Sequence, residues 1–253
     1  MVKKILSIFA WVATAAALVA LFVVSREHYL NTPVKSYNLD LQSGNSFVKE
    51  SDVLADLEEL CKAQKIGTVD MEAIGKRLKV NPWVESSAAH IGLDGTLNVS
   101  IAEHLPALRV FGYNGQSAYI TSDGLLLPPR QNHTPHLLIA SGNFSFEDGQ
   151  ARQLCDTVAS DLNLIGAKKL NEAIGRNGFV KSCIGQVFCN SGNEFEIVAN
   201  GIDARIIVGD TTILDDKLRR LETFMKHKMG SNEIKEYKKI NLKFKNQIVC
   251  TKR

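Results

Sequence analysis

The sequence lacks the cysteine and charge patterns that mark metalloproteins, disulfide-rich proteins and nucleic-acid binders. Its five cysteines are an odd number and none stands in a C-x-x-C pair, so neither a zinc site nor a disulfide framework is indicated. We interpret them as small buried hydrophobic residues. Cys183 and Cys189 fall on one predicted strand, about 20 Å apart and too far for a bridge. Apart from Lys3 and Lys4, 28 basic residues face 27 acidic ones, and therefore no nucleic-acid partner is expected.

Motifs for catalysis are also missing. There is no G-x-S-x-G nucleophile motif, and residues 175–178 lack the preceding strand and following helix of a phosphate-binding loop. His133 and His136 form the one close histidine pair, but they stand in a proline-containing loop without further ligands. Asp94 and Asp123 precede glycines, where carboxylates cap turns. We predict no enzyme activity, no metal, no cofactor and no small-molecule substrate.

Charge is absent from residues 5–24, which at about 1.5 Å per residue cover about 30 Å, the thickness of a bilayer core. Two lysines precede this run, so the positive-inside bias places residues 1–4 in the cytoplasm and the rest of the chain outside. A cleaved signal peptide is the alternative, but no polar region follows the small residues of the run. We predict a transmembrane helix over residues 5–25, in contact with the lipid bilayer.

Residues 34–104 have the pattern of a small β-α-α-β-β domain. Asn81-Pro82 ends a helical pattern that Asp70 can cap, and Trp83, expected in the core, begins an extended segment. Asp94-Gly95 supplies the tight turn of a hairpin. The other expected elements are a strand over 34–41, a helix over 53–61 and a strand over 97–101. Both helices can cover one face of a three-stranded sheet.

Residues 106–253 turn to short strands and form a second, mostly antiparallel β domain with two helices. One helix is predicted from Leu154, Val158 and Leu162, and another from the apolar face over 214–225. The strands are expected at 107–111, 117–121, 125–127, 179–190, 194–199 and 202–208. A meander is the simplest arrangement. The fold class is therefore α+β behind a single transmembrane helix.

The last strand is predicted over residues 237–252, because apolar and polar side chains alternate from Ile240 to Cys250 with Asn246 as the one exception. A strand at the end of a chain is often the edge of a sheet, and the alternative is that it is inserted between earlier strands. Unpaired backbone groups on such an edge can bind an incoming strand by β-augmentation.

Three of these features together resemble the FtsQ/DivIB family of bacterial cell-division proteins, in its Bacteroidetes form. They are the helix end at Asn81–Val84, the Gly95/Leu97/Val99 hairpin with its Glu103-x-x-Pro106 exit, and the terminal run 237–252. The resemblance implies a short cytoplasmic tail, one membrane span, a POTRA domain over 34–104 and a β domain over 106–253.

The resemblance also implies a function and a site. The protein would be a non-enzymatic divisome scaffold in the inner membrane at the division septum, with most of the chain periplasmic. Its POTRA domain would help bring it to the septum, and its terminal strand would bind FtsB/DivIC-like and FtsL-like proteins. The residues carried over as partner-binding are Lys243, Phe244, Lys245, Asn246, Gln247, Ile248 and Val249. Phe244 stands where many relatives have tyrosine, and the four-residue tail offers little to cytoplasmic partners.

Two alternatives stay open at this point. A membrane-anchored periplasmic enzyme would need polar groups that converge in a pocket. A POTRA-containing assembly factor would usually carry a transmembrane barrel, for which this chain is too short.

Overall fold

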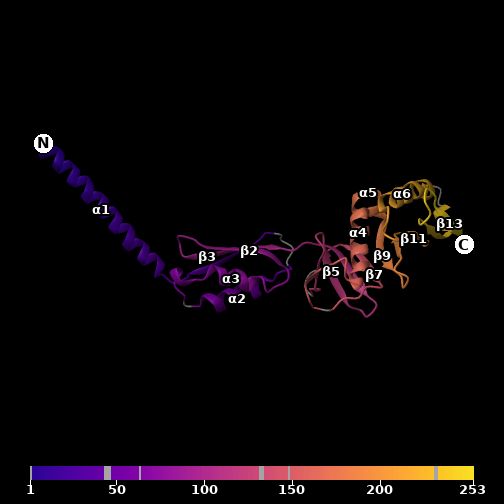
Figure 1. Cartoon of the computed structure of the whole chain (residues 1–253), viewed down its shortest axis with the longest axis horizontal. Coiled ribbons are helices and arrows are strands. Elements are labelled where there is room, and N and C mark those ends of the chain that lie inside the picture. Colours follow the sequence, from indigo (N-terminus) through magenta and orange to yellow (C-terminus); the bar gives the residue numbers. More distant parts are fainter. Residues whose placement is uncertain (1, 43–46, 63, 131–133, 148, 231–232) are drawn as a thin grey trace. The chain divides into compact units, whose positions relative to one another are not determined.

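The computed structural model describes residues 2–42, 47–62, 64–130, 134–147, 149–230 and 233–253. The chain divides into two compact units, Met1–Glu103 and His104–Arg253. The mixed α+β class, with an apolar N-terminal helix, a small sheet and a larger sheet, confirms the predicted fold class (Figure 1).

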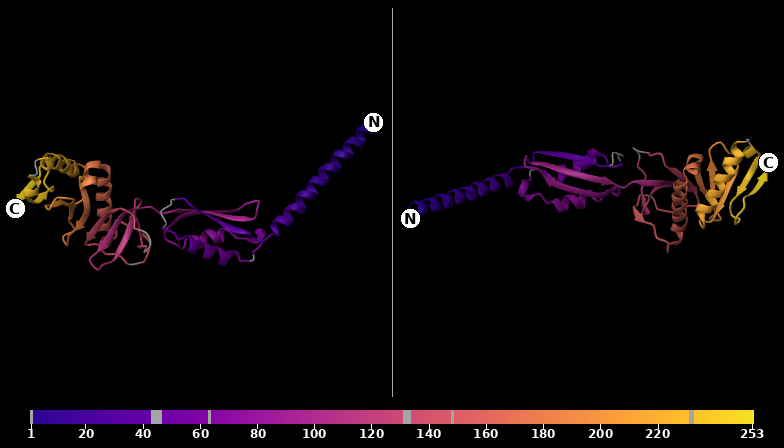
Figure 2. Two further views of the ribbon diagram at one scale, coloured as in Figure 1. Left: turned by 180° about the vertical axis from the view of Figure 1, so that it is seen from behind. Right: turned by 90° about the horizontal axis from the view of Figure 1, so that it is seen from above.

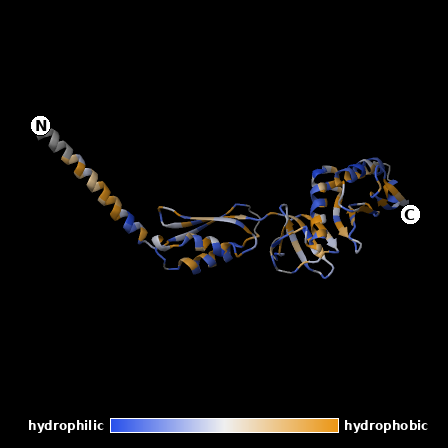
Figure 3. Cartoon of the chain, viewed as in Figure 1, coloured by the Kyte–Doolittle hydropathy of each residue, from blue (hydrophilic) through white to orange (hydrophobic). Residues whose placement is uncertain are grey.

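The first unit begins with helix α1, Val2–Leu30. Hydrophobic residues follow one another along most of it (Figure 3), and Phe9–Leu30 is long and apolar enough to cross a membrane. The unit continues with β1 Ser36–Leu41, α2 Glu50–Cys61, the 3-10 turn η1 Ile66–Thr68, α3 Met71–Leu78, β2 Val84–Ile91 and β3 Thr96–Glu103. The predicted β-α-α-β-β order is therefore present after α1.

Strand β3 is the centre of the small sheet, parallel to β1 and antiparallel to β2. Its side chains alternate between buried and half-buried, as the period-2 pattern predicted. Helices α2 and α3 lie on one face of the sheet (Figures 1 and 2). The Asp70 carboxylate caps α3 by accepting from the amides of Glu72 and Ala73, at 2.9 and 3.0 Å. Trp83 is fully buried and stacks on Phe47 with ring centroids 4.2 Å apart.

In its described residues, the second unit is a ten-stranded sheet with three α-helices. The strands are β4 Pro106–Gly112, β5 Ser117–Thr121, β6 Leu125–Leu127, β7 Leu138–Gly142, β8 Arg152–Gln153, β9 Ile184–Cys189, β10 Phe195–Ala199, β11 Arg205–Gly209, β12 Tyr237–Asn241 and β13 Val249–Lys252. The helices are α4 Leu162–Arg176, α5 Gly178–Cys183 and α6 Leu214–Gly230, with 3-10 turns η2 Ala159–Asp161 and η3 Glu233–Glu236. The strand order is β13-β12-β11-β10-β9-β7-β4-β5-β6-β8.

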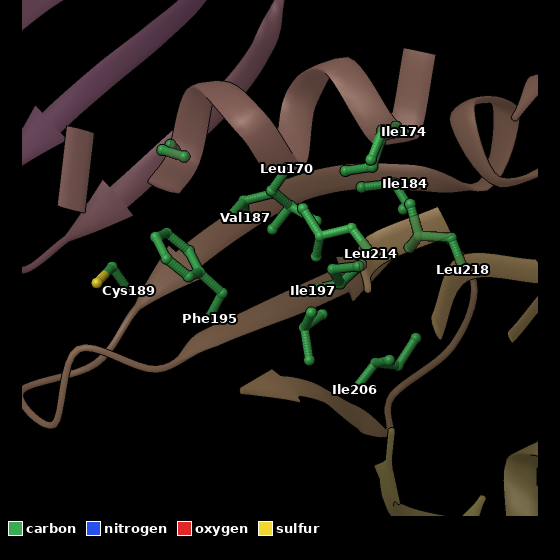
Figure 4. Packing of buried hydrophobic residues seen from close by; sticks show 14 of the residues in the cluster. Leu170, Ile174, Ile184, Val187, Cys189, Phe195, Ile197, Ile206, Leu214 and Leu218 are labelled. Carbon is green, nitrogen blue, oxygen red and sulfur yellow. The ribbon is translucent and has the colours of Figure 1, made fainter. Parts of the chain in front are cut away.

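Most neighbouring strands in this sheet are antiparallel, as predicted, but the sheet is not a simple meander. The pairs β4–β7, β7–β9 and β11–β12 are parallel. In the core, Leu170 of α4 lies beside Val187 of β9, and Ile174 of α4 lies beside Ile184 of β9 (Figure 4). Helix α4 lies close to β10 at Gly166, where an added Cβ atom would lie only 2.7 Å from the ring of Phe195.

Two predicted elements of this unit are wrong. The stripe Leu154, Val158 and Leu162 does not form a helix face, since Val158 and Leu162 are exposed and α4 begins only at Leu162. Residues 179–183 are helical instead of extended, because the Asn177 side chain accepts from the Val180 amide at 3.0 Å and caps the short helix α5.

The cysteines follow the predicted role only in part. Cys61 and Cys189 are buried, and burial raises the pKa of the Cys189 thiol to about 11. Cys155 is exposed, while Cys183 and Cys250 are half-buried. Cys183 ends α5 and does not share a strand with Cys189, so the argument from strand spacing does not apply, although both are free thiols.

Candidate functional site: the C-terminal edge of the large sheet

The C-terminal hairpin forms one end of the ten-stranded sheet (Figures 1 and 2). Strand β12 lies between β11, to which it is parallel, and β13, to which it is antiparallel. Strand β13 pairs with β12 alone among the strands that the structure describes. One long side of β13 is therefore an open sheet edge.

The predicted single strand over 237–252 is wrong. The chain leaves β12 after Asn241, reverses through residues 242–248 and returns as β13. Asn246, the one exception in the alternating pattern, has a φ of 61°, in the left-handed region where asparagine is common. The break in the pattern thus marks a turn.

The predicted site residues therefore belong to a different part of the hairpin than expected. Lys243, Phe244, Lys245, Asn246, Gln247 and Ile248 all lie in the connection between the two strands, and Val249 begins β13. None of them belongs to β12, which already has a neighbour on each side. The residues still lie next to the open edge, but the strand that presents this edge is β13.

A single arginine on α6 holds the connection in place. The Arg220 guanidinium donates to the carbonyl oxygens of Phe244 at 2.8 Å, Gln247 at 2.6 Å and Leu242 at 3.3 Å. Its Nε also donates to the Asp216 carboxylate at 2.9 Å, and its side chain is only 13% exposed. A planar group with five donors can bind these carbonyls and the Asp216 carboxylate together, whereas a lysine has three donors on a single nitrogen.

Further contacts tie both ends of the hairpin to the sheet. The Leu242 amide donates to Ile207 at 2.8 Å, and Leu242 is fully buried. The Lys243 ammonium pairs with Glu194. At the other end Lys252 pairs with Glu236 at 2.8 Å. The hairpin is thus fixed in position while its outer side stays open.

The register between β12 and β13 determines which backbone amides of β13 face the open edge. The Arg253 amide donates to the Glu236 carbonyl at 2.9 Å, and the bulge in the pair lies in β12, so β13 runs regularly. Successive amides of a strand point to opposite sides. The amide of Thr251 therefore faces β12, whereas the amides of Cys250 and Lys252 face the open side.

The surface around this edge is both apolar and basic. Phe244 and Val249 are 45% and 42% exposed. Lys245 is exposed and has no ion pair within the described part of the chain, whereas Lys252 is already paired with Glu236. The edge suits a partner strand that carries apolar and acidic side chains.

Other parts of the molecule have less of the character of a site. A cavity of about 500 Å³ is lined in part by His136, Asn171 and Glu172. Asn171 donates to the Ala107 carbonyl at 3.1 Å and Glu172 pairs with Lys168 at 2.6 Å, so these groups serve the local structure. Among the described residues no group of three or more potential metal ligands is present. His133 lies outside the described residues, and so the histidine pair has no described geometry.

The second unit, which contains this hairpin, matches a known protein family. The family model described as FtsQ/DivIB, C-terminal related, matches residues 105–251. The match covers 147 of the 253 residues and includes the whole C-terminal hairpin except its last residues.

The chain belongs to the FtsQ/DivIB family.

Membership confirms the resemblance inferred from the sequence. FtsQ/DivIB proteins are cell-division scaffolds of the membrane at the division site, so this FtsQ/DivIB protein has a role in cell division, with division proteins as its partners. None of the curated proteins compared with the chain matches it.

The sequence did not reveal Arg220 as part of the site. It stands in the run Leu218-Arg-Arg-Leu221, where two adjacent arginines follow a buried leucine, and nothing in this pattern separates Arg220 from Arg219. Only the fold brings Arg220 to carbonyl groups 22 to 27 residues further along the chain.

Proposed function

We propose that this protein is a non-enzymatic divisome scaffold that captures FtsB/DivIC-like and FtsL-like division proteins by strand addition to β13. The open edge of β13 is the observation that carries the proposal. Main-chain hydrogen bonds would supply affinity, and the side chains of residues 243–249 would supply selectivity for the partner.

The proposal includes an inner-membrane anchor. Helix α1 would supply the span over residues 5–25, and the lysines before it support a cytoplasmic location of residues 1–4 by the positive-inside bias. The two folded units are then periplasmic, on the same side of the membrane as the partner strand that would pair with β13.

The small β-α-α-β-β unit is assigned as a POTRA domain over 34–104, which helps bring the protein to the septum. Its order of elements and its sheet order β1-β3-β2 support the assignment. The β domain over 106–253 is the module that binds partners.

A proline at an outward-facing amide tests strand addition. Lys252→Pro removes one donor from the open side without removing a bond to β12, because the Lys252 amide faces outward. Lys252→Ala is the matched control, since it loses the same side chain and its ion pair with Glu236 but keeps the amide.

The measurement is co-purification of the full-length variants with an FtsB-like partner from detergent extracts. We expect Lys252→Ala to retain the partner and Lys252→Pro to lose it. Phe244→Ala and Lys245→Ala should weaken capture without abolishing it. Undiminished capture by a folded Lys252→Pro protein would eliminate strand addition at β13.

A further inference from the structure

The turn between β2 and β3 carries an unusually exposed apolar side chain. Leu93 stands at the tip of Gly92–Gly95 and is 95% exposed, the largest exposed fraction among the large hydrophobic side chains in the described part of the chain. The turn is well ordered by its own bonds, since Gly95 donates to Gly92 at 2.9 Å and Gly92 donates to Thr96 at 2.9 Å. Exposure of Leu93 is thus a property of a defined turn.

The same turn is bonded to the end of the apolar helix. The Tyr29 hydroxyl, in the last turn of α1, donates to the Gly92 carbonyl at 2.9 Å. The Lys35 amide donates to Gly95 at 3.1 Å. Helix α1 also packs against η1. Gly67 of η1 lies so close to Leu30 of α1 that an added Cβ atom would be 3.1 Å from the Leu30 side chain. The tip of the hairpin is therefore held beside the C-terminal end of α1.

This position corresponds to the headgroup layer if residues 5–25 cross the bilayer. Tyr29 follows the span by four residues, about 6 Å along the helix. A headgroup layer is roughly 5–7 Å thick on each side of the hydrocarbon core. Tyrosine is enriched at that depth. Leu93 follows directly on the residue that Tyr29 binds, and so it reaches the same layer.

The acidic residue of the turn does not compete for this position. Asp94 folds back on its own strand, where its carboxylate accepts from the Thr96 amide at 3.0 Å and the Thr96 hydroxyl at 2.8 Å. Lys35, whose methylene groups pack over Gly95, leaves a positive charge at the same end of the domain. Leu93 is thus the exposed apolar side chain of a tip that has a basic neighbour.

We propose that Leu93 inserts into the interface of the bilayer that α1 spans, so that the hairpin tip is a second membrane contact of the small domain. The inference rests on the proposed membrane anchor. It extends that anchor from one helix to a surface of the folded domain, which then has a defined height above the membrane and cannot rotate freely about a linker.

An environment-sensitive fluorophore at position 93 tests the contact. The background replaces Cys155, Cys183 and Cys250 with serine, while Cys61 and Cys189 are buried and do not react. Leu93→Cys is labelled with a nitrobenzoxadiazole group in the full-length protein, which is placed in nanodiscs of phosphatidylethanolamine and phosphatidylglycerol. The matched control is Val80→Cys, because Val80 is also exposed, at 74%, but lies before β2, about 24 Å from the turn.

We expect the label at 93 to emit at shorter wavelength than the label at 80. It should also be quenched by lipids with a nitroxide near the headgroup and be protected from iodide. Equal emission and equal iodide access at the two positions would overturn the inference. Protection from iodide without quenching by the nitroxide lipids would overturn it as well, because a protein contact would then cover the tip.

Carbonate extraction of membranes distinguishes a failure of the α1 membrane anchor from a failure of the Leu93 insertion. Release of the wild-type protein by carbonate would contradict the anchor on which the inference rests. Retention in the membrane together with a water-exposed label at 93 would leave the anchor intact and reject only the insertion of Leu93.

Discussion

Arg220 has a specific structural role, which is to hold the connection between β12 and β13 in place. Arg220→Ala removes three hydrogen bonds from a guanidinium to carbonyl oxygens, at 2.6, 2.8 and 3.3 Å. Bonds to a charged group contribute about 1.5–3 kcal/mol each, but they are not additive and the longest is weak. The carbonyls of Phe244 and Gln247 can turn to water, since both residues are exposed. We expect the free energy of local opening of the hairpin to fall by about 2–4 kcal/mol.

Hydrogen exchange of the full-length protein in detergent, followed by mass spectrometry, measures this opening. Because about 1.4 kcal/mol is a factor of ten, exchange in residues 242–252 should become roughly 30-fold faster or more in Arg220→Ala. Arg220→Lys should give an intermediate rate, since an ammonium cannot reach all three carbonyls. Exchange in α4 should not change.

Arg219→Ala is the matched control. Arg219 is adjacent in sequence and pairs with the same carboxylate, Asp216, at 2.7 Å, but its side chain is 72% exposed and is bonded to none of these carbonyls. Its removal should change stability by less than about 0.5 kcal/mol. Equal exchange in Arg220→Ala and Arg219→Ala would refute the role of Arg220.

Two further predictions concern ion pairs of the large unit. Asp161→Asn breaks a buried bidentate pair with Arg152, in which both contacts are 2.6 Å, and should lower the free energy of unfolding by about 3 kcal/mol in denaturant titration. Asp215→Asn breaks an exposed pair with Arg176 and should lower the free energy of unfolding by less than about 0.5 kcal/mol. Equal losses in the two variants would contradict the reasoning. Hydrogen bonds from Lys217 and Thr212 lower the pKa of Asp210 to about 2, so the stability it contributes is present above its ordinary value near 3.8 and is lost as the pH falls toward 2. Asp210 is 69% exposed, so this contribution is under about 1 kcal/mol, and the Tm difference between wild type and Asp210→Asn should shrink from pH 5 to pH 2 instead of staying constant.

The small unit could be predicted from sequence because its signals are local. The Asp70 cap, the stop at Pro82 and the Asp94-Gly95 turn each act within a few residues, and the structure contains all three elements that they delimit. Strand periodicity predicted the buried face of β3 for the same reason.

The site was harder to predict, because its geometry depends on contacts distant in sequence. Alternation alone allows residues 240–250 to be one strand, whereas contacts distant in sequence, above all the bonds from Arg220 on α6, hold the reversal in place. The stripe Leu154, Val158 and Leu162 failed for a similar reason. There Arg152 and Asp161 fix the chain just before α4, and two of the three apolar side chains remain in solvent. Apolar spacing shows what a helix would bury, but it does not show which contacts compete with that helix.

The most direct test of the central claim is amide exchange at Cys250 and Lys252, residue by residue, in the full-length protein with and without a bound FtsB-like partner. Strand addition predicts that both amides, which face the open side of β13, exchange fast in the free protein and become protected in the complex. The inward amide of Thr251 should already be protected in the free protein. A complex in which Cys250 and Lys252 exchange as fast as in the free protein would contradict the account.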